Sequence, residues 1–61
     1  MYLTEEQVQE MFEEFVLPSV VKDYGADDEI AIRTAFNDYT DFLCKEGEIS
    51  EEQYDTMENP Y

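Results

Sequence analysis

The sequence predicts an all-α fold: a small three-helix bundle whose first helix is kinked or broken at Pro18. Two observations lead to this class. Apolar residues recur at steps of three and four, the period of a helix, above all between Ala31 and Gly47. The only β-like runs, residues 15–17 and 19–21, are short and flank a proline. The chain, residues 1–61, is short enough for a single helical domain.

The stretch from Ala31 to Gly47 is predicted to be the central helix, against which every other element packs. We expect this helix over residues 28–46, with Asp27 as its N-cap and Gly47 as its C-terminal stop. Its apolar residues gather into one stripe at the helical period. They are Ile32, Ala35, Phe36, Tyr39, Phe42 and Leu43.

A capping box marks the start of the first helix, predicted over residues 5–17. Thr4 is the expected N-cap, and Gln7, three residues later, can bond back to the main chain of Thr4. Leu3 and Val8 occupy the two positions of a hydrophobic staple. This pattern predicts a well-defined helix start.

The same six-residue pattern returns at Ile49–Tyr54, where it predicts a last helix over residues 51–57. We interpret the repeat as two helices that are capped in the same way. A true duplication would show similarity beyond six residues, and none is visible. Asn59 and Pro60 are expected to end this helix.

Pro18 is expected to interrupt the first helix. A proline inside a helix removes a hydrogen bond and clashes with the preceding turn, so Leu17 should lie at the break. Val20, Val21 and Tyr24 indicate further helical turns, closed by Gly25 in a left-handed cap.

A common core is predicted from the apolar residues of the three expected helices. Its expected residues are Val8, Met11, Phe12, Phe15, Ile32, Ala35, Phe36, Tyr39, Phe42, Leu43, Tyr54 and Met57. A chain of this length buries only about 60% of its unfolded surface, so a homodimer is left open.

Charge is the outstanding property of the composition. Seventeen Asp and Glu face three Lys and Arg, which gives a formal net charge of −14. Glu29 with Arg33, and Asp41 with Lys45, are expected to pair within the central helix. The remaining carboxylates are left without partners. Such a charge disfavours contact with nucleic acid and anionic membranes and favours a basic partner.

Catalysis and cofactor binding are not expected. The chain has no His, no Gly-rich phosphate loop, and no Ser or Cys with a base partner. The acids around Gly25 fail the spacing of an EF-hand, because the twelfth position counted from Asp23 is Thr34. Cys44 is the single cysteine and is expected to fill a gap between helices. Together with the absence of a signal peptide or an apolar span, it suggests a cytoplasmic protein.

The C-terminal half carries a run of residues that resembles a family. Phe36-Asn37-Asp38, with Asp41, begins the run, and a Leu-Cys-Lys-acid-Gly turn follows at residues 43–47. An Ile-Ser cap at residues 49–50, a Gln-Tyr helix start at residues 53–54 and Asn59-Pro60 complete it. This half is similar to a group of short bacteriophage proteins with no assigned chemistry. The resemblance implies a phage origin, and therefore the host cytoplasm, but no mechanism.

The acidity suggests an inhibitor that blocks a basic, nucleic-acid-binding site on a host protein, as a DNA mimic. Helical acids at i, i+3 and i+4 lie about 5–6 Å apart, a spacing comparable to that of phosphates along a strand. Suitable partners are a nuclease, a restriction or CRISPR component, a repair enzyme or a transcription factor. The expected contact residues are Glu6, Glu10, Glu13, Asp38, Asp41, Glu48, Glu51, Glu52 and Asp55, with Glu58 beside them.

The alternative is a small interaction module that binds a host protein through tyrosine and apolar contacts, with the charge serving solubility and steering. Tyr2, Tyr24, Tyr54 and Tyr61 exceed what so small a core needs, and tyrosine favours interfaces. The two hypotheses differ in how strongly binding depends on salt.

Overall fold

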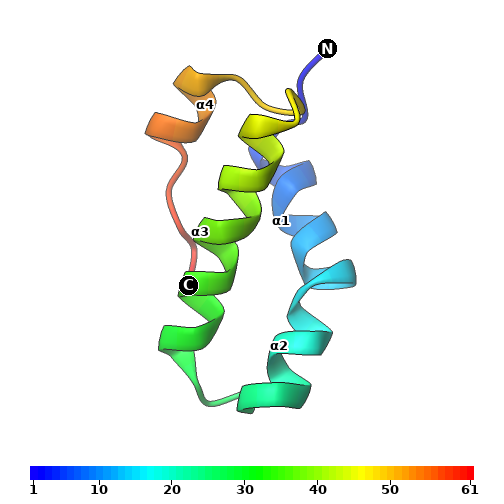
Figure 1. Ribbon diagram of the computed structural model, residues 1–61, viewed down its shortest axis with the longest axis vertical. Coiled ribbons are helices and arrows are strands. Elements are labelled where there is room, and N and C mark those ends of the chain that lie inside the picture. Colours follow the sequence, from blue (N-terminus) through cyan, green and yellow to red (C-terminus); the bar gives the residue numbers. More distant parts are fainter.

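The computed structural model describes residues 1–61, and the chain forms four helices and no strand. The helices are α1 (Glu5–Phe15), α2 (Leu17–Tyr24), α3 (Glu29–Lys45) and α4 (Glu51–Thr56). The all-α class is confirmed, but a bundle of three helices is not, because the segment after Val16 is a helix in its own right. In Figure 1, α1 and α2 follow each other along one side of α3, and α4 and the C-terminal tail lie on another. No helix has the length and apolarity that crossing a lipid bilayer requires.

The interruption between α1 and α2 lies at Val16, two residues before the proline, and a kink at Pro18 is not seen. Val16 is both the C-cap of α1 and the N-cap of α2, with φ −110° and ψ −48°. Pro18 then sits in the first turn of α2, where its missing N–H would have no helical partner anyway. An unbroken helix would drive the proline ring against the carbonyl of Glu14, so the break precedes it.

Both predicted capping boxes are confirmed. The Gln7 main-chain N–H donates to the Thr4 hydroxyl at 3.1 Å, and the Thr4 N–H donates to the Gln7 side chain at 2.9 Å. The equivalent bonds between Gln53 and Ser50 measure 3.0 and 2.8 Å. The two cap residues share the same backbone conformation, φ −81° and ψ 162°.

The cap of α3 differs by one residue from the prediction. Asp28, and not Asp27, accepts the Ala31 N–H through its carboxylate, at 3.0 Å. Gly25 follows α2 at φ +97° and Gly47 follows α3 at φ +77°, values that residues with a side chain rarely adopt. Both glycines therefore stop their helices as expected, although the ψ of Gly25, 153°, is not that of a left-handed helical residue.

The core is built around two phenylalanines. Phe12 of α1 is fully buried and meets Phe36 of α3 edge-on, with ring centroids 5.1 Å apart. Five aliphatic side chains complete the buried cluster: Val8, Val20, Ile32, Leu43 and Ile49. Met11 is half-buried, and Ala35, Tyr39 and Met57 are partly buried and pack against this cluster.

Three residues predicted for the core are exposed. Phe15 is 67%, Phe42 53% and Tyr54 38% accessible. For Phe42, the reason is that α4 and the tail cover one flank of the α3 stripe and leave the other open. Thr40, a polar residue on the covered flank, is buried, whereas Phe42 on the open flank is not. At α4, Ile49 takes the buried place expected for Tyr54.

The C-terminal tail, residues 57–61, is fixed to α3 and α1. Asn59 donates to the Arg33 carbonyl and to the Asn37 side chain, both at 3.0 Å. The Tyr61 ring packs on Phe12 with a centroid distance of 5.3 Å, and its hydroxyl donates to Glu13 at 3.1 Å. Tyr61 is therefore part of the core and not a spare surface tyrosine.

Replacement of Ser50 by Ala is expected to unfold α4 locally and to cost about 1 kcal/mol of stability. A helix of six residues does not persist without its cap and its packing. Urea unfolding and hydrogen exchange of the Gln53 amide measure the two effects. Ser19→Ala is the matched control, since Ser19 is exposed on α2 and its side chain makes no hydrogen bond. Equal losses in the two variants would contradict this role of Ser50.

Tyr61 is expected to make folding sensitive to alkali. Burial, together with the hydrogen bond to Glu13, raises the pKa of Tyr61 from 10.0 to about 12. The pKa is raised in the folded state, so the stabilisation is complete below pH 10 and is lost as the pH rises through about 12. Tyr61→Phe should cost about 1 kcal/mol at neutral pH, and should lose less stability between pH 10 and 12 than wild type. Urea titrations across this range test it, and parallel curves for both proteins would contradict it.

Candidate functional site

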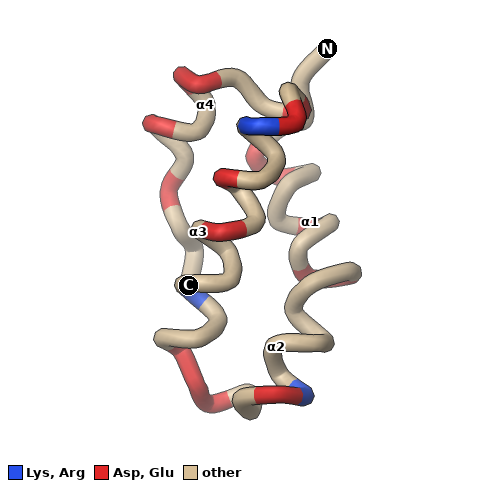
Figure 2. The backbone as a smooth tube through the Cα atoms, viewed as in Figure 1, with Lys and Arg blue, Asp and Glu red and all other residues tan.

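The acidic side chains of the expected contact set come from every part of the fold except α2. Glu6, Glu10 and Glu13 lie on α1, on the side away from the buried Val8 and Phe12. The others come from α3, from the loop that follows it and from α4 (Figure 2). All are exposed except Asp41, which is half-buried; they are Glu6, Glu10, Glu13, Asp38, Asp41, Glu48, Glu51, Glu52 and Asp55.

Very little of this negative charge is neutralised. The one ion pair joins Lys45 Nζ to Asp41 Oδ2 at 3.0 Å, and the hydrogen bond and charge of Asp41 raise the pKa of Lys45. The expected pair between Glu29 and Arg33 does not form. Arg33 instead donates to the main-chain oxygen of Tyr61 at 3.1 Å, because the tail lies beside it. Of the nine expected contact residues, Asp41 alone is paired with a cation.

The structure joins the two capping motifs that are distant in the sequence. The Leu3 N–H donates to the Glu48 carbonyl at 2.9 Å, and the Gln53 side chain donates to the Leu3 carbonyl at 2.8 Å. The starts of α1 and α4 are thereby held at one end of the molecule (Figure 1). Their first turns each carry two acids, Glu5 and Glu6 in α1 and Glu51 and Glu52 in α4. This end of the molecule is therefore strongly acidic, with Glu48 between the two helix starts.

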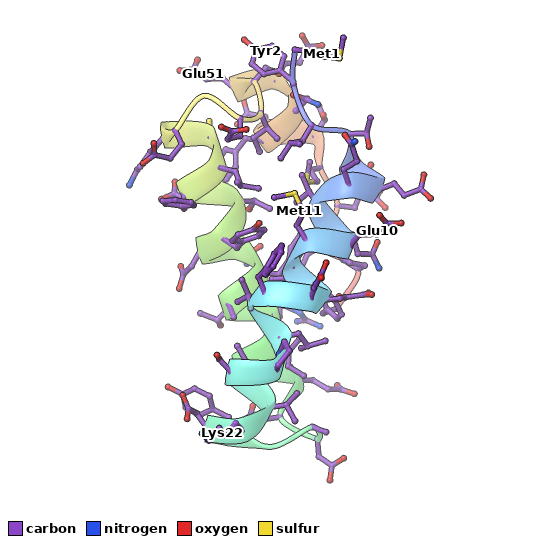
Figure 3. The ribbon with its side chains drawn as sticks, turned by 90° about the vertical axis from the view of Figure 1, so that its right-hand side faces the viewer. Met1, Tyr2, Glu10, Met11, Lys22 and Glu51 are labelled. Carbon is purple, nitrogen blue, oxygen red and sulfur yellow. The ribbon has the colours of Figure 1, made fainter.

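A second surface feature is apolar and includes two phenylalanines that were expected in the core. Phe15 lies about half a turn around α1 from Glu13, and Phe42 about half a turn around α3 from Arg33. Since the tail contacts Glu13 and Arg33, both phenylalanines lie on the flank that the tail leaves open. Figure 3 views the molecule with α4 and the tail behind, and Met11 extends there from α1 toward α3.

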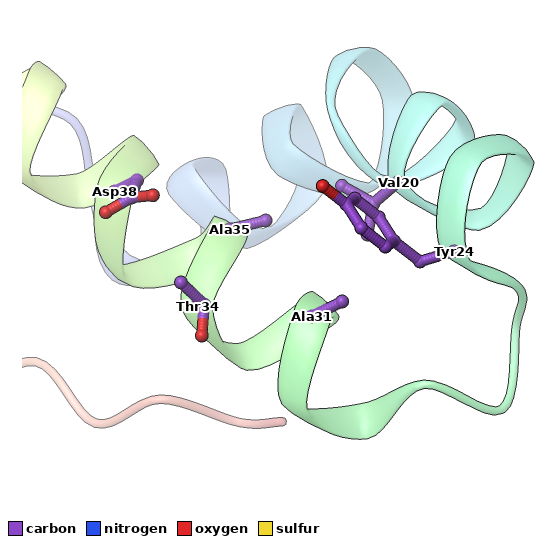
Figure 4. Close-up of a pocket in the computed structure, with 6 residues that line it drawn as sticks. All are labelled: Val20, Tyr24, Ala31, Thr34, Ala35 and Asp38. Carbon is purple, nitrogen blue, oxygen red and sulfur yellow. The ribbon is translucent and has the colours of Figure 1, made fainter.

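This open flank includes a pocket between α2 and α3. It has a volume of about 270 Å³ and is lined by Val20, Tyr24, Ala31, Thr34, Ala35 and Asp38 (Figure 4). Asp38 is the only residue of the predicted contact set in this lining. The small residues at positions 31, 34 and 35 fall on one face of α3, a signal that was present in the sequence.

The Asp, Glu and Cys side chains, which are residue types that can bind metal ions, either have structural roles or are dispersed over the fold. No group of three or more Asp, Glu and Cys side chains is arranged to hold a metal ion. Asp28, in the acidic turn, caps α3. Cys44 is half-buried and packs against the core, as expected for a residue that fills a gap between helices.

Comparison of the chain with models of protein families, with curated proteins and with solved structures finds no match to any of them. The resemblance of the C-terminal half to short bacteriophage proteins therefore stays a prediction. Arguments about function rest on the surface itself.

Proposed function

We propose that the protein is a phage-type inhibitor that blocks a basic, nucleic-acid-binding site on a host protein, as a mimic of DNA. The observation that carries this proposal is the unneutralised charge. Eight of the nine contact residues are exposed, and the single ion pair of the protein leaves those eight without a cation. Of these eight carboxylates, only that of Glu13 serves the fold, by accepting the Tyr61 hydroxyl. The other seven are not needed by the fold, since their mutual repulsion destabilises a compact chain.

The arrangement of the acids supports the proposal. On α1, Glu6, Glu10 and Glu13 are three and four residues apart and form one row on a regular helix. The row begins at the end of the molecule where Glu51 and Glu52 open α4. Lys and Arg side chains of a groove that normally holds phosphates would meet carboxylates at comparable spacing, and binding would release counterions as it does with DNA.

Capture from a bacterial lysate tests this function. The tagged protein is expected to retain a nucleic-acid-binding protein that elutes at moderate salt and is displaced by duplex DNA. Mass spectrometry identifies the captured protein. A single partner that survives high salt and ignores DNA would contradict mimicry.

A second candidate function is an interaction module that binds through apolar and tyrosine contacts. The observation in its favour is the exposure of Phe15, Tyr24 and Phe42, which are 67%, 66% and 53% accessible. Exposed aromatic residues of this size are typical of protein interfaces. An interface of this kind would keep its affinity for the partner as the salt concentration rises. The same elution experiment therefore distinguishes this function from DNA mimicry.

A further inference from the structure

The pocket between α2 and α3 exists because the facing side chains of α3 are small. Ala31, Thr34 and Ala35 lie on one face of α3 together with Asp38 one turn further on. Opposite them, α2 contributes the buried Val20 and the exposed ring of Tyr24 (Figure 4). The result is an open apolar trough along α3, not a sealed cavity.

The two ends of this trough differ in chemistry. Tyr24 flanks the end near Ala31, and the carboxylate of Asp38 lies at the other, about 10 Å further along the helix axis. Asp38 is exposed and has no hydrogen-bond or ion-pair partner within the chain. The trough is therefore complementary to a group with an apolar stem and a positively charged head.

Other occupants fit this chemistry less well. A purely apolar side chain would cover Asp38 without giving it a partner, which carries a desolvation cost. A second copy of the chain would bring another net charge of −14 against the acids of this one. Among cationic side chains, arginine fits better than lysine, since its planar head bonds a carboxylate through two parallel N–H groups and sheds water more readily.

We propose that this trough binds an arginine side chain of the basic partner, with the methylene stem across Ala35 and Ala31 and the guanidinium on Asp38. The identity of the partner rests on the proposed function, whereas the preference for arginine rests on the trough alone. The trough thus anchors one residue of the partner, and the acidic rows supply the longer-range attraction.

The test is a titration of the protein with N-acetyl-arginine amide, followed by NMR at constant ionic strength. We expect saturable shifts of the Tyr24, Ala31, Ala35 and Asp38 amides in the millimolar range. N-acetyl-citrulline amide, which has the same shape without the charge, should not produce them. Shifts of equal size at the acids of α1 and α4, or no saturable shift at the trough, would overturn the proposal.

Two variants sharpen the titration. Asp38→Asn is expected to weaken arginine binding about fivefold, the upper range for an exposed ion pair, and Tyr24→Ala to weaken it as well. Glu5→Gln is the control, since it removes the same charge at the far end of the fold and should leave the affinity unchanged. Equal weakening by Asp38→Asn and Glu5→Gln would reduce the effect to net charge and overturn the site.

The arginine titration and the capture experiment test the trough and the proposed function independently. Arginine binding at the trough, together with a captured partner that duplex DNA does not displace, would retain the trough and reject mimicry. A partner displaced by DNA, with no arginine shifts at the trough, would do the reverse.

Discussion

Replacement of Phe12 by Ala is expected to cost about 3–5 kcal/mol, close to the whole stability of so small a domain. The Phe12 side chain is fully buried and its ring contacts Phe36, Tyr39 and Tyr61 at centroid distances of 5.1, 5.9 and 5.3 Å. These partners come from α3 and from the tail, so the cavity would loosen three parts of the fold at once. The chain should lose cooperative thermal unfolding, measured by circular dichroism.

Phe15→Ala is the matched control for this prediction. It makes the same change one turn later on α1, but Phe15 is 67% exposed and should cost well under 1 kcal/mol. If Phe12→Ala melted within a few degrees of wild type, or if the two variants were equally unstable, the placement of the core would be wrong.

The second large effect is expected from neutralising the acidic row of α1. Replacing Glu6, Glu10 and Glu13 together by Gln should weaken binding to the captured partner about 100-fold or more, if each acid makes a charged contact. The slope of log affinity against log salt concentration should become shallower by at most about 2.7, since each of the three charged contacts contributes about 0.9 to it. Gln at position 13 keeps an oxygen that can accept the Tyr61 hydroxyl, so the fold should survive.

A control with the same change of charge decides whether position matters. Asp23, Asp27 and Glu29 are exposed acids of α2, the following turn and the start of α3, outside the expected contact set. Their joint replacement by Asn, Asn and Gln should leave affinity almost unchanged. Equal losses in the two triple variants would mean that net charge alone drives association, and the row on α1 would lose its special role.

Local signals in the sequence predicted the helix starts well. Thr4 with Gln7, and Ser50 with Gln53, form the capping boxes that their spacing predicts, because a capping box depends on four consecutive residues only. Local rules also predicted a kink or break at Pro18, but the interruption lies at Val16 and no kink is seen at the proline. Such features need no knowledge of tertiary packing.

Which apolar residues would be buried was harder to predict. The stripe of α3 is wider than the elements available to cover it, so periodicity could not tell that Thr40 would be covered and Phe42 left open. That choice depends on where α4 and the tail settle, and the tail is held by bonds from Asn59 and Tyr61 across more than twenty residues. The trough beside Asp38 lies between α2 and α3, and its form depends on how these two helices pack. The sequence therefore predicts Asp38 only as a member of an acidic row.

The most direct test of the central claim is the affinity of the protein for its captured partner, measured by calorimetry at several salt concentrations and with competing duplex DNA. A mimic of DNA should bind with an affinity that falls linearly with salt on logarithmic axes, and DNA should compete for the same site. An affinity that is unchanged by salt, with a ternary complex of partner, DNA and protein, would contradict mimicry and point to the apolar flank around Phe15 and Phe42.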